Sequence, residues 1–197
     1  MSGNLDIFRN EYLGANTWPQ RKDGVPLYLL DKLSAEELKK AEIELIKSAD
    51  TSDSWPIIGL GHIKSTGSLP KLYKLLARSN RKMRVVIAHS IFQICGDKRM
   101  IDIVLEEVPL ITNFYELIDI VYMLPSFKDE RITTMLNHFR VHKDYLVAYN
   151  ATRALGLSTE EIVNKFRNQK ATDKIAISEI NLPKTERKWW QKIFGTK

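Results

Sequence analysis

Apolar side chains recur three and four residues apart over most of this chain, and that period predicts helices rather than strands. The clearest helix begins at Ser34, a good capping residue, and Glu37 three residues later completes a capping box. The stretch LSAEELKKAEIELIKSAD then predicts a helix to about Asp50, with Leu38 and Ile43 on its apolar face. We expect an all-α protein.

Residues 1–33 show a mixed pattern. A short helix is predicted over Leu5, Phe8 and Tyr12, and turn chemistry follows at Asp23-Gly24. We interpret this segment as an N-terminal arm or cap.

From residue 55 onward one design recurs: an apolar helix, a break and a second amphipathic helix. The units span 55–80, 81–111, 112–142 and 143–168, and 34–54 forms a half-repeat before them. Their breaks fall at Thr66-Gly67, Gly96-Asp97, Pro125-Ser126 and Gly156 to Ser158. The helix predicted from Arg81 to Cys95 is apolar on two sides, as a helix between successive repeats requires.

The second helices share a register. Their aligned apolar positions are Leu75, Leu105, Leu136 and Phe166, which lie 30, 31 and 30 residues apart. A period near 30 with two helices per unit predicts an α-α superhelix, or solenoid, because one hairpin cannot bury its own apolar face and must stack on neighbours. The alternative is an irregular helical bundle, which does not require such even spacing.

These units resemble HEAT repeats in their short bacterial form. The resemblance lies in the segments GLGHIKSTGSLPKLYKLL, HSIFQICGDKRMIDIVL and ATRALGLSTEEIVNKF, and it covers about residues 55–168. The third unit departs from the pattern, because Leu124-Pro125 stands where the others place Gly. The resemblance implies a stacked superhelix of HEAT-like helical hairpins whose face binds a partner, and it implies no reaction.

Composition agrees with an ordinary globular chain of 197 residues, with 44% hydrophobic and 27% charged side chains. The single cysteine, Cys95, cannot form an internal disulfide, which favours a reducing, cytoplasmic location. No secretory signal is recognisable at the N-terminus, and no run approaches the roughly 18 apolar residues of a membrane helix.

No catalytic, cofactor-binding or metal-binding pattern is present in the sequence. The four histidines lack metal-ligand spacing, and His138 and His142 have no third ligand nearby in the chain. Cys95 occupies a position where the aligned repeats place an apolar residue, so we expect it to be a small buried hydrophobe. The chain is therefore expected not to be an enzyme.

The net charge of +6 is unevenly distributed. Residues 1–50, 51–100, 101–150 and 151–197 carry −2, +7, −4 and +5. Eight cations of the block 51–100 are candidate partner-binding residues: Lys71, Lys74, Arg78, Arg81, Lys82, Arg84, Lys98 and Arg99. They form either a patch that steers an acidic partner or a surface neutralised by Glu106, Glu107 and Glu116.

The last segment, 169–197, ends in PKTERKWWQKIFGTK. Trp189, Trp190, Ile193 and Phe194 would lie on one side of a short helix surrounded by basic residues. Such a helix either caps the apolar end of the array or docks on a partner or an anionic membrane surface.

Two functions remain open. The first is a non-enzymatic protein-binding module, such as an adaptor, a regulator or a toxin-neutralising immunity protein, that recognises an acidic or bipolar protein surface. The second is nucleic-acid binding, because the HEAT-like alkylpurine DNA glycosylases are basic solenoids of similar size. The second function is disfavoured for two reasons. The tryptophans that could hold a flipped-out base lie outside the middle repeats, and the acidic block 101–150 lies where the phosphate backbone of DNA would have to run.

Overall fold

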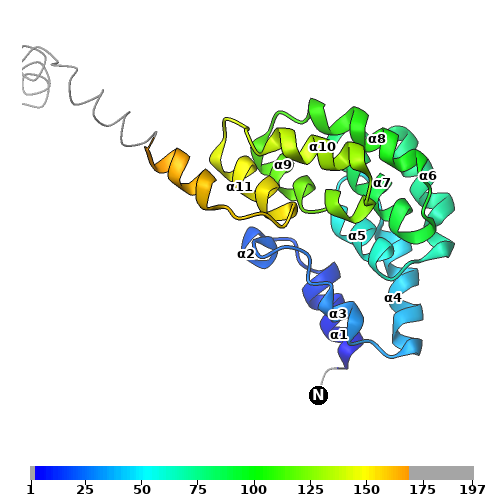
Figure 1. Cartoon of the computed structure of the whole chain (residues 1–197). Helices are drawn as coiled ribbons and strands as arrows, with labels where there is room; N and C mark the ends of the chain where they lie inside the picture. Colours follow the sequence, from blue (N-terminus) through cyan, green and yellow to red (C-terminus); the bar gives the residue numbers. More distant parts are fainter. Residues whose placement is uncertain (1–2, 169–197) are drawn as a thin grey trace, which may run out of the picture. The chain divides into compact units, whose positions relative to one another are not determined.

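The computed structural model describes residues 3–168 and divides the chain into two compact units, 1–157 and 158–197 (Figure 1). Every regular element in the described range is helical. The all-α prediction is confirmed.

The first unit contains eleven α-helices joined by shorter turns. They are α1 (Asn4–Phe8), α2 (Trp18–Arg21), α3 (Tyr28–Asp31), α4 (Ala35–Ser48), α5 (Ser54–His62), α6 (Leu69–Arg78), α7 (Arg81–Cys95), α8 (Arg99–Glu107), α9 (Phe114–Val121), α10 (Glu130–Phe139) and α11 (Tyr145–Ala154). A π-helical turn, η1 (Arg9–Leu13), continues α1, and the 3-10 turns are η2 (Thr66–Ser68), η3 (Val108–Leu110) and η4 (Leu124–Phe127). In the second unit, residues 160–168 are helical.

The predicted start of α4 is confirmed in atomic detail. The Glu37 backbone N–H donates to the Ser34 hydroxyl oxygen, and the Glu37 carboxylate accepts from the Ser34 backbone N–H at 2.9 Å. Both partners therefore satisfy amide groups that would otherwise be unpaired at the first turn.

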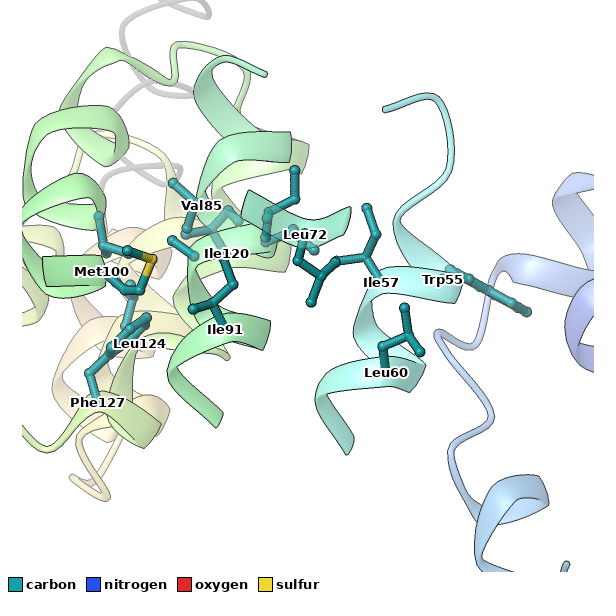
Figure 2. Close-up of a cluster of buried hydrophobic side chains, with 14 of the residues drawn as sticks. Trp55, Ile57, Leu60, Leu72, Val85, Ile91, Met100, Ile120, Leu124 and Phe127 are labelled. Atoms are coloured by element: carbon teal, nitrogen blue, oxygen red, sulfur yellow. The ribbon is translucent and has the colours of Figure 1, made fainter. Parts of the chain in front are cut away.

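The helices of the first unit contact one another in a regular order. Helices α4, α5, α7, α9 and α11 touch in succession, α6 and α8 pack against α7, and α10 packs against α8 and α11. Seven consecutive residues of α7, Val85–Ile91, are buried, so this helix has neighbours on every side. Figure 2 shows part of the resulting core, with Leu60 of α5 and Ile120 of α9 at separate points along it.

Residues 3–33 contact helices α4 and α5 of the helical array formed by α4 to α11. The Tyr12 hydroxyl donates to the Trp55 carbonyl oxygen at 2.8 Å, and the Tyr12 ring packs beside the Trp55 ring. Arg21 forms two hydrogen bonds with the Asp53 carboxylate, at 2.9 and 2.6 Å. The predicted arm is thus held on the array by specific contacts.

Helix α5 approaches its neighbours closely at two glycines. A Cβ on Gly59 would lie 2.6 Å from the Tyr12 hydroxyl oxygen, and a Cβ on Gly61 would lie 3.0 Å from the Ser90 Cα. Any larger residue would force η1 or α7 away from α5. The glycines therefore permit the close packing of α5 between the arm and the array.

The prediction for Cys95 was wrong, because this side chain is exposed. Helix α7 ends at Cys95, and Gly96 follows in the left-handed conformation at φ 69°. Cys95 is thus the last residue of α7 and is exposed at the helix end. The Cys95 thiol donates to the Ile91 carbonyl oxygen of its own helix, at 3.3 Å.

Candidate functional site

Lys71, one of the predicted partner-binding cations, belongs to α6, and its side chain reaches the C-terminal end of α4. Its ammonium group donates to the Ile46 carbonyl oxygen and, at 3.2 Å, to the Lys47 carbonyl oxygen. Carbonyl groups in the last turn of a helix lack helical partners and carry partial negative charge, so a cation there is stabilising. Lys71 therefore joins α6 to α4.

Arg81 and Arg84 are both engaged at the end of α8. The Glu107 carboxylate, on a residue that is only 8% exposed, accepts from the Arg84 guanidinium at 2.9 Å and from the Arg81 backbone N–H at 2.8 Å. The Arg81 guanidinium donates to the Leu110 carbonyl oxygen at 3.3 Å. A buried carboxylate requires such partners, because without them burial would cost several kcal/mol (about 3–5).

Lys82 and Arg99 also have acidic partners. Lys82 on α7 forms an ion pair of 2.7 Å with Asp119 on α9. Arg99 contacts both oxygens of Asp97, and the Tyr73 hydroxyl donates to the same carboxylate at 2.7 Å. These hydrogen bonds hold the pKa of Asp97 well below its ordinary value, and the one from Arg99 has the largest effect. The same contact with Asp97 raises the pKa of Tyr73 to about 12.

Three of the predicted cations have no acidic or carbonyl partner within residues 3–168. They are Lys74, Arg78 and Lys98, and all three are exposed. Lys74 and Arg78 are four residues apart on α6, so they share one face of that helix. Trp189 and Trp190 lie outside the described residues.

A cavity of about 510 Å³ lies between the N-terminal arm and helices α5, α7 and α9. Its apolar wall includes Val25 and Leu27 from the arm, Trp55 and Ile58 from α5, Val86 from α7 and Met123 after α9. These residues are separated by up to about one hundred positions in sequence, and the wall is complete only when the arm lies on the array. No sequence pattern marks such a site in advance.

His89 forms part of the wall and is 6% exposed. The Ser126 hydroxyl donates its single proton to the Met123 carbonyl oxygen at 2.6 Å, so the hydrogen bond of 2.7 Å between His89 and Ser126 must come from the His89 Nε2–H. Nδ1 is then an acceptor, and it is buried without a partner among the described residues.

Burial lowers the pKa of His89 to about 4, which keeps the ring neutral at pH 7. The unpaired nitrogen costs about 1–3 kcal/mol of folding free energy. The sequence shows only that the histidines lack the spacing of metal ligands. It does not predict that His89 is buried beside a cavity.

Each charged side chain in the cavity wall has an internal partner. Arg21 pairs with Asp53 and lies 4.4 Å from the centre of the Trp55 ring, and Lys82 pairs with Asp119. His62 contacts Asp31 at 2.6 Å, and Lys22 pairs with Asp23 at 2.8 Å. The wall therefore combines apolar surface, paired charges and a few neutral polar groups.

Residues 3–168 hold no cluster of three or more side chains suited to a metal ion, and none of the helices in this range has the length and apolar character to cross a bilayer. Comparison with protein-family models, with curated proteins and with solved structures found no match to this chain.

Proposed function

We propose that this protein is a non-enzymatic binding module built of HEAT-like helical hairpins, an adaptor, regulator or immunity protein that recognises an acidic surface on another protein. The observation that carries the proposal is the pair Lys74 and Arg78. Both are exposed, both lack an internal partner in the described part of the chain, and they lie together on α6.

The order of helix contacts supports the repeat architecture in this proposal. In a stacked array the first helices of successive units touch in order, and the second helices pack beside them. Helices α5, α7, α9 and α11 contact in that order, and α6, α8 and α10 pack against this series. In such an array α6 belongs to the row of second helices.

Unpaired cations contribute to binding differently from paired ones. A lysine already held by Asp119, such as Lys82, must break an ion pair before it can contact a partner. Lys74 and Arg78 have no such pair to break, so their charge is available to attract an acidic surface and to raise the association rate. We therefore assign the partner contact to the unpaired cations, and first to Lys74 and Arg78, because these two share one face of α6 whereas Lys98 lies at the start of α8.

The experiment compares two double charge reversals that alter net charge equally. Lys74→Glu with Arg78→Glu removes the proposed contact, whereas Lys39→Glu with Lys40→Glu changes two exposed lysines of α4. Each variant and the wild type are used as bait in cell extract with and without nuclease treatment, at low and at physiological salt, and captured proteins are quantified by mass spectrometry.

We expect proteins that are captured by the wild type and by the α4 variant to be depleted at least tenfold with the α6 variant. Equal capture by both variants would remove α6 from the proposal. Capture that disappears on nuclease treatment, together with a salt-dependent shift of labelled duplex DNA, would replace the protein partner by nucleic acid. Circular dichroism of each variant establishes that the fold is intact.

A further inference from the structure

We propose that the cavity between the N-terminal arm and helices α5, α7 and α9 is a binding site for a small, uncharged aromatic molecule. The proposal is independent of the α6 contact, because none of the residues that line the cavity belongs to α6. It rests on the size of the cavity, on the character of its wall and on the pairing of its charges.

Size and shape fit a molecule with one or two rings. Cavities that bind small molecules are commonly about 300–1,000 Å³ in volume, and this one is about 510 Å³. It is walled on several sides, by the arm residues Val25 and Leu27 and by three helices. The site is partly open, so a ligand there would lose part of its contact with water.

The wall favours an aromatic ligand. The half-buried side chains of Val25, Leu27 and Ile58 supply apolar surface, and the Met123 thioether is polarisable and makes favourable contacts with rings. Behind them the Trp55 ring is only 6% exposed and is held by the Arg21 guanidinium 4.4 Å from its centre, so this part of the wall is preformed. A preformed wall does not lose conformational entropy on binding.

The charges favour an uncharged ligand. Arg21, Lys22, His62 and Lys82 each contact an aspartate, and Asp119 is the partner of Lys82. An anion or a cation would have to compete with one of these pairs, or lose part of its hydration beside the apolar wall without gaining a partner. A neutral molecule avoids both costs.

Neutral hydrogen-bonding groups remain for the ligand's polar atoms. Within residues 3–168 the side chains of Ser54 and Gln93 form no hydrogen bond, and both line the cavity. The unpaired His89 Nδ1 is buried behind this wall, so Ser54 and Gln93 are the groups that a ligand can reach. A ring that carries one N–H or O–H group matches this set.

The test uses indole as the probe, with indole-3-carboxylate and tryptamine as its negatively and positively charged analogues. Binding is followed at pH 7 by the ring signals of His89 in two-dimensional NMR of labelled full-length protein. Because His89 is neutral at this pH, small changes of pH between titration points leave its signals unmoved. We expect a saturable shift with indole, and at least tenfold weaker binding of both charged analogues.

Two substitutions locate the site. Ile58→Trp fills the cavity from α5, and Val25→Trp fills it from the arm if the first variant does not fold. Ile103→Trp is the matched control, because Ile103 is half-buried like Ile58 but lies on α8 outside the cavity wall. We expect the cavity variants to lose at least tenfold in indole affinity and the control to stay within twofold.

Three results would overturn the proposal. The first is the absence of a saturable His89 shift up to the solubility limit of indole. The second is binding of a charged analogue as tightly as indole. The third is indole affinity that survives the cavity-filling substitutions in a folded protein.

Discussion

The contact between Gly59 and Tyr12 allows a quantitative test of how the arm packs on the array. A Cβ at position 59 would lie 2.6 Å from the Tyr12 hydroxyl oxygen and 3.3 Å from both terminal methyl carbons of Leu45. The hydroxyl cannot move away freely, because Tyr12 is 1% exposed and donates to the Trp55 carbonyl oxygen. The substitution Gly59→Ala therefore creates a clash with one fixed atom.

Two opposing effects determine the size of the change. Alanine in a helix interior is favoured over glycine by about 1 kcal/mol, whereas overpacking a tight core costs about 1–3 kcal/mol. We expect Gly59→Ala alone to destabilise the protein by up to about 2 kcal/mol. Tyr12→Phe alone removes one buried hydrogen bond and costs about 1 kcal/mol.

In the double variant the clashing oxygen is absent and the nearest remaining atoms are those of Leu45, at 3.3 Å. A leucine side chain shifts by a few tenths of an ångström at little cost. The effect of Gly59→Ala should therefore change from a loss to about zero or a gain. The coupling between the two substitutions should be at least about 1 kcal/mol, well above the additivity limit of about 0.5 kcal/mol.

Urea unfolding followed by far-ultraviolet circular dichroism measures all four proteins of this cycle. Gly67→Ala is the matched control, because a Cβ there would meet nothing closer than a Glu42 carboxylate oxygen at 3.8 Å. Additive effects of Gly59→Ala and Tyr12→Phe would refute the close approach of η1 to α5.

Three further predictions concern stability. Because the pKa of His89 is about 4 when folded and about 6.5 when unfolded, the unfolded chain binds its proton first as the pH falls. About 3 kcal/mol of stability should be lost between pH 6.5 and pH 4, and a His89→Gln variant should lack this component in unfolding titrations. Glu107→Gln should cost about 2 kcal/mol, because Arg84 loses a charged partner in a largely buried pair, while exposed Glu106→Gln should be neutral in urea unfolding. Ser34→Ala should cost about 1 kcal/mol by the same measurement, through loss of the α4 cap.

Much of the secondary structure could be predicted because its determinants are local. The Ser34 and Glu37 capping box, the apolar period of α7 and the glycine at position 96 each act within one or two turns of helix. The end of α7 was also predicted at Cys95. The burial of Cys95 was predicted wrongly, because alignment of the predicted units does not show which side of the last helical turn faces solvent.

The cavity could not be predicted, because its wall depends on the arm lying against α5, α7 and α9. In the sequence, Val25 and Leu27 lie among turn-forming residues, and His89 is one polar residue in an apolar helix. The relevant signal was the pair Gly59 and Gly61 on α5. Two glycines on a helix interior are costly unless neighbours approach closely, and here η1 and α7 do so.

The uneven charge along the chain acquires a different meaning in the folded structure. The positive block 51–100 and the negative block 101–150 meet within the fold, where Lys82 pairs with Asp119 and Arg84 with Glu107. The Lys82–Asp119 pair joins α7 to α9 in the next predicted unit, whereas the Arg84–Glu107 pair joins α7 to the end of α8 within one predicted unit. Adjacent blocks of opposite sign therefore supply ion pairs within the fold, with or without a charged partner. Of the eight predicted cations, only those unpaired within residues 3–168, which are Lys74, Arg78 and Lys98, are free to contact the proposed partner.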